Sequence, residues 1–443
     1  MSESTVNKRK SWGEAFAVYL EPRQLIILVM GFASGLPLLL TLSTLSYWLS
    51  KVGADLTAIG FFAAVGTPYG FKFLWSPVID QVRLPILANL LGHRKSWLLV
   101  LQILLAVAIF ALGLTDPAKN PFGTALVVLI VAFFSASQDI VIDAYRIEIL
   151  SAEEQAAGAA TTQIGYRFGL LLAGAGAIAL SDFASWPTVF SVLAACIFAC
   201  AAFTLFIPEP EVRRPAFVND YAAWVREAVV EPFREFTQRR GWVVVLLFIL
   251  FYKFGDAFSG FLANPFYVKM GFSGVEIALM TKIYGLLATM IGGLLGGAIV
   301  ARIGLFKTLM IGGVLQAATN LLFTMLALRG HDPVWLGIAI TADNLAGGLA
   351  AAAFVAYLSG LCNRAFTATQ YALLSSFMAQ GRTLMSVPSG WLAKQLDWPE
   401  FWALTAFMAI PGLILLVWLM RLYPDEKKLT TEKKEEEIAQ VFS

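Results

Sequence analysis

Charged residues are scarce in this chain, and so are cysteine and histidine. Asp, Glu, Lys and Arg make up 14% of the 443 residues, whereas an ordinary soluble domain has about 25%. A soluble fold could not cover so long a chain with so little polar surface, so we exclude one. The 32 basic and 30 acidic side chains nearly cancel, which argues against nucleic acid as a partner. The three Cys residues lie in apolar runs and the two His residues lie far apart, so we expect neither a disulfide framework nor a metal site.

Long apolar runs dominate the sequence instead. Hydrophobic residues make up 58% of it, and the mean hydropathy is +0.72. Because a membrane-spanning helix needs about 20 mostly apolar residues, the runs predict an all-α membrane protein with twelve transmembrane helices. Eight predicted spans contain no charge, namely 24–50, 96–115, 120–138, 183–208, 283–301, 308–328, 344–363 and 401–420. Four spans contain charges, namely 57–75, 155–181, 241–267 and 365–393.

The distribution of Lys and Arg predicts the orientation of these spans. With the N-terminus inside, most of the 32 basic residues fall in segments on the cytoplasmic side. The opposite side keeps only Lys51, Lys119, Lys269, Arg329 and Lys394. Because cytoplasmic loops carry the excess of Lys and Arg, we expect both the N- and C-termini in the cytoplasm. The first apolar run is too long for the core of a signal peptide, so we expect the mature chain to keep it.

One long polar connection divides the spans into two six-helix bundles. We predict a cytoplasmic N-terminal segment at 1–23, a first bundle at 24–208, a central cytoplasmic loop or surface helix at 209–240, a second bundle at 241–422 and a charged cytoplasmic tail at 423–443. The basic end of the central segment could lie on anionic lipid headgroups, or the segment could be a solvated linker helix. Similar strings precede the second and eighth spans, at 52–60 and 270–278. Such repeats let a transporter build two rocking bundles around a central site.

Several strings carry a family resemblance. Gly297–Lys307 resembles the loop signature of the major facilitator superfamily, although Ala301 stands where the signature has an acid. More specific strings lie in the first half, at 31–38 (GFASGLPL), 71–77 (FKFLWSP), 135–146 (SASQDIVIDAYR), 158–160 (GAA) and 165–167 (GYR). Over most of residues 20–215 the chain resembles the AmpG-type muropeptide permeases, a bacterial branch related to acetyl-CoA transporters.

The resemblance implies inward, proton-dependent transport of N-acetylglucosaminyl-1,6-anhydro-N-acetylmuramyl peptides by alternating access across the bacterial inner membrane. These anionic sugar-peptides are turnover products of peptidoglycan, and their recycling is linked to β-lactamase induction. We expect no cofactor, with the proton gradient as the source of energy. We also expect the protein to be a monomer within the lipid bilayer. The alternative is a transporter of another bulky anion such as acetyl-CoA. We do not expect an enzyme, because no nucleotide-binding loop, zinc helix or nucleophile elbow is present.

Charged side chains at bilayer depth are the first candidates for a functional site, because each costs about 2.5–3.5 kcal/mol to insert. The basic ones are Lys72, Arg167, Lys253, Lys282 and Arg382. The acidic ones are Asp139, Asp143, Asp256 and Asp343. The excess of positive charge predicts a cavity for an anionic substrate, whose carboxylates Arg can bind with two hydrogen bonds. We take the basic residues as substrate-binding candidates and the acidic ones as proton-coupling candidates.

The first-half charges have a second interpretation. Asp139 and Asp143 are one helical turn apart and share a helix face. One carboxylate could bind the proton while its neighbour tunes the pKa of that carboxylate. Alternatively, both could join a structural network with Arg167 or Lys72. We favour the structural network for Asp143 and leave both interpretations open for Asp139.

The second-half charges are also ambiguous. Lys253 and Asp256 are three residues apart and could pair with each other. Asp343 has no charged neighbour on its own helix, which suits proton coupling, but it could meet Lys282 or Arg382 across the bundle. Arg382 and Arg167 occupy equivalent places in the two halves, where they could bind substrate or join packing networks.

Neutral residues complete the set of candidates. Tyr69, Tyr166 and Tyr284 lie within spans, where aromatic rings could pack on the C–H faces of sugars, and Gln138 adjoins them as a further substrate-binding candidate. Pro37 removes a backbone donor and permits a bend in the first span. The gating or conformational candidates are Ser34, Gly35, Pro37, Asp80, Arg94 and Arg302.

Overall fold

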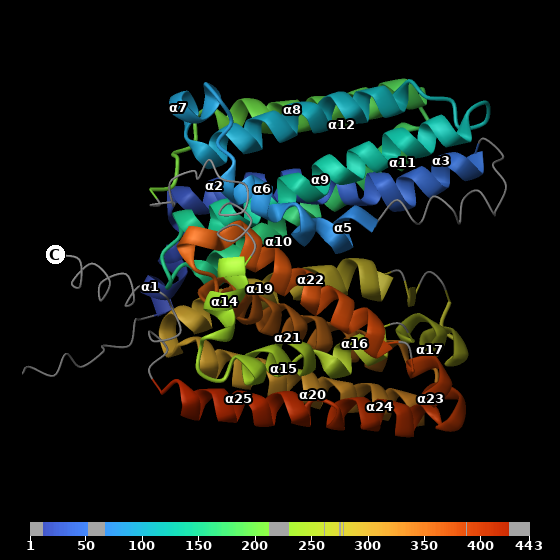
Figure 1. The fold of residues 1–443 in the computed structure, drawn as a ribbon. Coiled ribbons are helices and arrows are strands. Elements are labelled where there is room, and N and C mark those ends of the chain that lie inside the picture. Colours follow the sequence, from blue (N-terminus) through green and yellow to red (C-terminus); the bar gives the residue numbers. More distant parts are fainter. Residues whose placement is uncertain are drawn as a thin grey trace, which may run out of the picture.

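The computed structural model describes residues 12–51, 67–211, 230–260, 262–273, 276–277, 279–386 and 388–424. These residues are nearly all helical. Two groups of helices lie side by side with roughly aligned axes, the first half of the chain in one and the second half in the other (Figure 1). Ten helices within the described residues are long and apolar enough to cross a membrane.

The first group contains five of these spans. They are α2 (Pro22–Leu39), α8 (His93–Gly113), α9 (Pro121–Ile149), α10 (Gln155–Leu171) continued by α11 (Ala177–Leu180), and α12 (Trp186–Thr204). Shorter helices complete the group, namely α1 (Trp12–Ala17), α3 (Leu45–Lys51), α5 (Thr67–Phe71), α6 (Ser76–Gln81) and α7 (Leu87–Leu91). Residues 57–66 of the predicted second span (57–75) lie outside the described residues, and the described part consists of α5 and the 3-10 helix Lys72–Leu74.

The second group contains the other five spans. They comprise α15 (Trp242–Phe251) with α16 (Phe254–Gly260), α19 (Gly285–Ile303), α20 (Leu305–Arg329), α21 (Pro333–Gly360), and α24 (Trp398–Phe407) with α25 (Ile410–Leu422). The remaining helices are α14 (Glu231–Thr237), α17 (Ala263–Lys269), α22 (Thr367–Ser386) and α23 (Ser389–Gln395). The predicted eleventh span corresponds to α22 and α23. Of the predicted central segment and tail, 212–229 and 425–443 lie outside the described residues.

Two predicted spans were cut short at a charged residue, and both boundaries are wrong. We ended the fourth span at residue 138 and began the tenth at residue 344, whereas α9 runs on to Ile149 and α21 begins at Pro333. Asn120 and Asp332 cap these helices, accepting hydrogen bonds from the backbone N–H of Gly123 (2.9 Å) and Trp335 (3.0 Å). A side-chain cap followed by Pro is a strong helix start. The buried charges therefore lie within continuous helices.

Other spans are interrupted. The predicted span 241–267 is broken after Phe251, and a turn at Tyr252 and Lys253 separates α15 from α16. Three spans contain π-helical segments, which often occur at functional sites. These are Leu40–Thr44, Leu172–Gly176 and Leu279–Tyr284. The first begins three residues after Pro37, which lies inside α2.

The surface of the bundle is apolar where its long helices face outward. Large side chains such as Val107, Phe198, Ile291 and Ile414 are exposed there. An extended apolar surface of this kind needs an apolar partner, and the bilayer supplies one for a chain with ten candidate spans.

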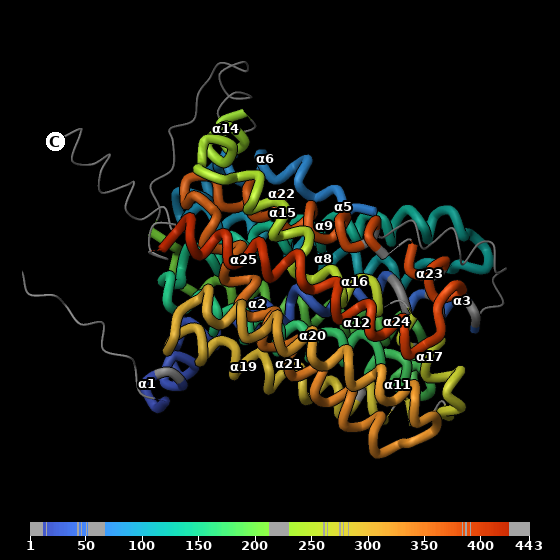
Figure 2. The backbone as a smooth tube through the Cα atoms, turned by 90° about the horizontal axis from the view of Figure 1, so that it is seen from below, coloured from blue at the N-terminus to red at the C-terminus, as the bar shows by residue number. Residues whose placement is uncertain are grey.

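The halves meet along two seams. In one seam, α10 packs against α19 and α21; in the other, α22 packs against α5, α6 and α9, which lie beside it in both views (Figures 1 and 2). Gly297 permits the first seam, because a Cβ there would lie 2.9 Å from the Cα of Ala157. We call the end of the bundle at the left of Figure 1, where α7 lies and α25 ends, the basic end. Arg94 lies in the first turn of α8, next to α7, and Arg302 and Arg421 lie in the last turns of α19 and α25.

Candidate functional site

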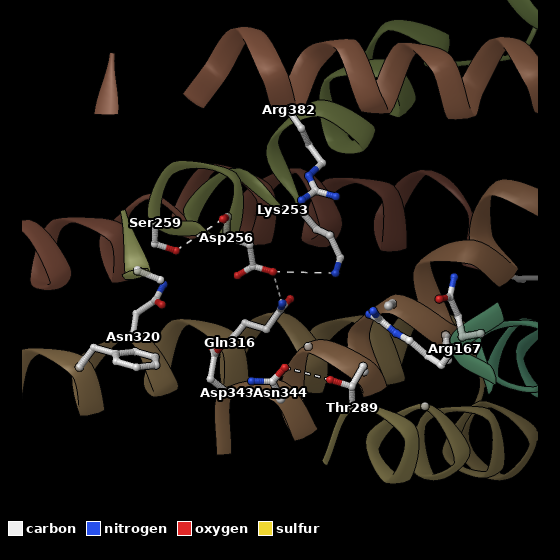
Figure 3. A pocket seen from close by; sticks show the side chains of 18 of the residues that line it. Arg167, Lys253, Asp256, Ser259, Thr289, Gln316, Asn320, Asp343, Asn344 and Arg382 are labelled. Atoms are coloured by element: carbon white, nitrogen blue, oxygen red, sulfur yellow. Dashed lines mark hydrogen bonds and ion pairs between the residues drawn. The ribbon is translucent and has the colours of Figure 1, made fainter. Parts of the chain in front are cut away.

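A cavity of about 390 Å³ lies between the two halves. The first half contributes three lining residues, all from α10, and the second half contributes the rest (Figure 3). The residues of the first half are Ala160, Gln163 and Arg167. The polar and aromatic lining of the second half consists of Lys253, Asp256, Ser259, Tyr267, Thr289, Gln316, Asn320, Phe323, Asp343, Asn344, Arg382 and Trp402. Five of the nine predicted buried charges therefore meet in one space.

The cations of the cavity differ in how they are paired. The Nζ atom of Lys253 lies 3.8 Å from Oδ2 of Asp256, so the predicted local pair is present. Neither Arg167 nor Arg382 has a carboxylate partner among the described residues, and Nε of Arg167 is buried without a hydrogen bond there. Figure 3 shows the two guanidinium groups reaching into the cavity from different elements. Unpaired guanidiniums at bilayer depth can bind an anion.

The carboxylates of the cavity contact neutral groups. Asp256 accepts a hydrogen bond from the amide of Gln316, in addition to its contact with Lys253. Asp343 accepts one from the hydroxyl of Thr319 at 3.0 Å. Of its two predicted partners, Arg382 makes no ion pair with it, and the side chain of Lys282 lies outside the described part of the structure.

Three other charged candidates, Lys72, Asp139 and Asp143, lie in the first half, apart from the cavity. Ser34 donates a hydrogen bond to Asp139 at 2.6 Å. Lys72 lies 3.6 Å from Asp143, and Arg146 lies 3.8 Å from the same carboxylate. Asp143 thus sits in the structural network that we favoured for it, and none of these residues lines the cavity.

The neutral candidates also lie away from the cavity lining. Gln138 donates to the backbone oxygen of Ala33 at 2.9 Å. The hydroxyl of Tyr69 is buried with no hydrogen bond in the described chain, and Tyr284 is half exposed. Tyr166 lies on α10 against Gly35, where a Cβ added to the glycine would collide with the backbone carbonyl oxygen of Tyr166. Gly35 therefore serves close packing of α2 on α10.

The gating candidates at the basic end divide into two environments. Arg94 lies 2.6 Å from both Asp80 and Glu148, and the three side chains are at most 1% exposed. Asp80 also reaches across to the other half, where it accepts hydrogen bonds from the backbone N–H (2.8 Å) and hydroxyl (2.9 Å) of Thr369 at the start of α22. Arg302 instead stacks on the ring of Trp12 at 4.3 Å.

Sequence reasoning missed two groups of residues. Glu148 and Thr369 complete the contact between the halves, and Glu148 could have been noticed two residues after Arg146. The amides of Gln163, Gln316, Asn320 and Asn344 line the cavity, but they carry no charge, so a search for buried charges passed over them. An amide within an apolar span was the available signal.

Known proteins share both the sequence and the fold. The sequence profile of the Major Facilitator Superfamily matches residues 25–286 and 249–442. The chain is 42% identical over 402 residues to the anhydromuropeptide permease of Escherichia coli K12, covering 90% of this chain and 80% of the relative. It is 36% identical over 405 residues to a putative AmpG transporter of Rickettsia conorii, covering 91% and 97%.

Solved structures agree at the level of the fold. The proton:xylose symporter XylE superposes with a TM-score of 0.66 at 13% identity, over 94% of this chain and 97% of that one. The human organic anion transporter MFSD10 superposes with a TM-score of 0.63 at 14% identity, over 91% and 98%. With a matching superfamily profile, permease relatives over nine-tenths of its length and a shared two-bundle fold, the chain belongs to the AmpG-type muropeptide permeases of the major facilitator superfamily.

Proposed function

We propose that this protein imports anhydromuropeptides, N-acetylglucosaminyl-1,6-anhydro-N-acetylmuramyl peptides, across the bacterial inner membrane in symport with protons. The observation that carries the proposal is the central cavity, in which two guanidiniums that have no carboxylate partner among the described residues face a space shared by both halves. Muramyl peptides carry carboxylates, which such guanidiniums bind with two hydrogen bonds each. The name of the E. coli relative supports this substrate class.

Proton coupling is assigned to Asp139 and Asp343. Each carboxylate contacts a hydroxyl, that of Ser34 or Thr319, rather than a cation. A hydroxyl can donate to a carboxylate and can accept from a carboxylic acid, so either protonation state keeps its hydrogen bond. Asp143 and Asp256 instead form ion pairs with Lys72 and Lys253. The proton gradient then drives transport without a bound cofactor.

Alternating access requires the contacts at the basic end to break. In this structure Asp80 joins α6 to the start of α22, and the Arg94 and Glu148 side chains hold it there. Because Arg94, Arg302 and Arg421 lie at this end, we place it in the cytoplasm. The conformation described here would then be closed toward the cytoplasm.

The same orientation completes the topology. We propose twelve spans with both termini in the cytoplasm, with α5 belonging to the second span and α22 to the eleventh. These two helices meet at the seam between the halves, so the spans outside the ten apolar ones would be those that border the transport path. We further propose that the protein works as a monomer.

Uptake of labelled anhydromuropeptide into proteoliposomes tests the function. We expect accumulation when the interior is alkaline, and only slow equilibration when the two pH values are equal. Uptake that ignores the pH gradient would remove proton coupling, and absence of uptake would remove the function. Competition with acetyl-CoA addresses the alternative substrate: stronger inhibition by acetyl-CoA than by unlabelled muropeptide would favour that alternative.

A further inference from the structure

The central cavity has two chemically different ends. Figure 3 shows Asn320 at one side of the view and Arg167 at the other, with Asp256, Lys253 and Gln316 between them. Phe323 follows Asn320 by one turn on α20, and the ring of Trp402 stacks on that of Phe323. All three residues line the cavity, and we call them the neutral wall. Arg167 lies opposite Asn320, and Arg382 lies above Lys253 in the view; we call these two arginines the cationic pole.

The neutral wall is held rigidly by aromatic packing. The rings of Phe323 and Trp402 stack with centroids 4.5 Å apart. Trp402 also packs edge-on against Phe266 at 5.3 Å and Phe401 at 6.0 Å. A fixed aromatic surface beside an amide suits a sugar, which offers apolar C–H faces together with hydroxyl and acetamido groups.

The indole N–H of Trp402 lacks a partner. It is buried without a hydrogen bond in the described part of the chain. Other indoles find backbone acceptors: Trp97 donates to Val82 at 2.8 Å and Trp335 to Leu322 at 3.0 Å. Buried polar groups in native proteins normally have a hydrogen-bond partner. Because Trp402 lines the cavity, a bound molecule can supply the missing acceptor.

The cationic pole draws its charges from both halves. Arg167 lies on α10 and is the one charged lining residue from the first half, whereas Arg382 lies on α22. Neither has a carboxylate partner among the described residues. Lys253 is engaged by Asp256, so the two arginines are the free sites for carboxylates.

From this asymmetry we infer that the cavity binds glycopeptides in one orientation, with the saccharide on the neutral wall and the carboxylates on the cationic pole. The inference rests on the proposed function and deepens it by naming which part of the substrate each wall recognises. The first half then contacts the substrate mainly through Arg167, which binds a carboxylate of the substrate. The second half contacts the sugars.

A cycle that combines altered ligands with altered proteins tests the orientation. The ligands are the full anhydromuropeptide, the same compound with its carboxylates amidated, and the same compound without the N-acetylglucosamine. Binding to purified protein is measured by calorimetry. We expect Arg382→Gln and Arg167→Gln each to weaken binding of the full ligand about tenfold, as for a charge-assisted hydrogen bond, and to bind the amidated ligand as the wild type does.

The neutral wall should respond to the other ligand. Trp402→Phe keeps a ring but removes the N–H, and we expect about fivefold weaker binding of the full and amidated ligands. Asn320→Leu serves as a second variant of this wall should Trp402→Phe disturb folding. The variants at this wall should bind the ligand without N-acetylglucosamine with affinity closer to that of the wild type.

Matched controls lie outside the cavity. Trp335→Phe removes an indole N–H that already has its acceptor, and Arg329→Gln removes an exposed arginine that pairs with Asp332. Both should bind all ligands as the wild type does. If arginine and tryptophan variants lose the same factor for every ligand, or if their ligand dependence is reversed, the orientation is wrong. If the wild type binds no muropeptide, the proposed function fails as well.

Discussion

The two halves of this permease use their membrane-embedded charges in different ways. In the first half the charges meet one another, as in the contacts of Arg94 with Asp80 and Glu148 at 2.6 Å. In the second half they line an open space, where Lys253 and Asp256 are 3.8 Å apart. A fully buried charge needs a closely placed partner, whereas a charge beside a wet cavity can remain unpaired until a ligand binds. Buried charges thus join helices to one another in the first half and line the cavity in the second.

Arg167 is the one first-half charge among the described residues that line the cavity, because it lies on α10, which packs against α19 and α21 of the other half. The comparison leads to predictions that separate stability from binding. They run from the largest expected effect to the smallest.

The buried ion cluster should dominate stability. Arg94→Gln leaves Asp80 and Glu148 without their shared guanidinium, which should lower the free energy of unfolding by about 3–5 kcal/mol. Arg382→Gln, at the cavity, should change it by less than about 0.5 kcal/mol. Denaturant unfolding in detergent measures both, with Arg83→Gln in an exposed loop as control. Equal stability of the Arg94 and Arg382 variants would refute the distinction between the halves.

The two aspartates of α9 should separate coupling from structure. Asp139→Asn should abolish accumulation while leaving insertion and exchange intact, because the proton site is lost. A potential of 100 mV supplies about 2.3 kcal/mol per proton, so the loss can reach ~50-fold. Asp143→Asn should instead lower stability, because Lys72 and Arg146 lose their carboxylate, and it should still accumulate substrate. Accumulation by the Asp139 variant would remove that residue from the coupling mechanism.

The seam between the halves can be disturbed at one glycine. In Gly297→Ala the new Cβ would lie 2.9 Å from Ala157 Cα, and overpacking of this kind costs about 1–3 kcal/mol. Gly293→Ala is the matched control, because its Cβ would lie 3.6 Å from Ala160 Cβ, an ordinary contact. Thermal unfolding compares the two. Equal melting temperatures of the two variants would show that the seam between α10 and α19 accommodates the added methyl group without loss of stability.

The smallest effect concerns equivalent helix caps in the two halves. Asn120 caps α9 with a neutral amide and Asp332 caps α21 with a carboxylate. The Trp335 backbone N–H holds the pKa of Asp332 below its ordinary value. A lowered folded-state pKa stabilises the cap above the unfolded pKa of about 3.9, and this contribution is lost as the pH falls below it.

Hydrogen exchange at the start of each helix measures this difference. Acidification should lower the protection factors at the start of α21 more than those at the start of α9, after correction for the intrinsic pH dependence of amide exchange, and Asp332→Asn should remove this difference. An unchanged profile in that variant would show that the cap carboxylate does not cause it.

The sequence predicted contacts between residues that are close neighbours along the chain. The pair of Lys253 and Asp256 followed from their three-residue spacing. The network around Asp143 was one of the two interpretations that shared helix faces allowed. By contrast, nothing local indicated that Thr369 would meet Asp80, because these residues lie on different halves of the chain. The break after Phe251 was missed because Lys253 and Asp256, which follow it, were interpreted as charges buried within a continuous span.

The sequence by itself determined the solvent, the family and the set of charges that need an explanation. Scarcity of charge and long apolar runs follow from composition, and an ion in a bilayer is costly wherever the chain folds. Only the tertiary structure decided which charges are paired with other side chains and which face the cavity. That choice depends on how two helix bundles pack against each other, since a distance between side chains on different helices is not encoded in either helix alone.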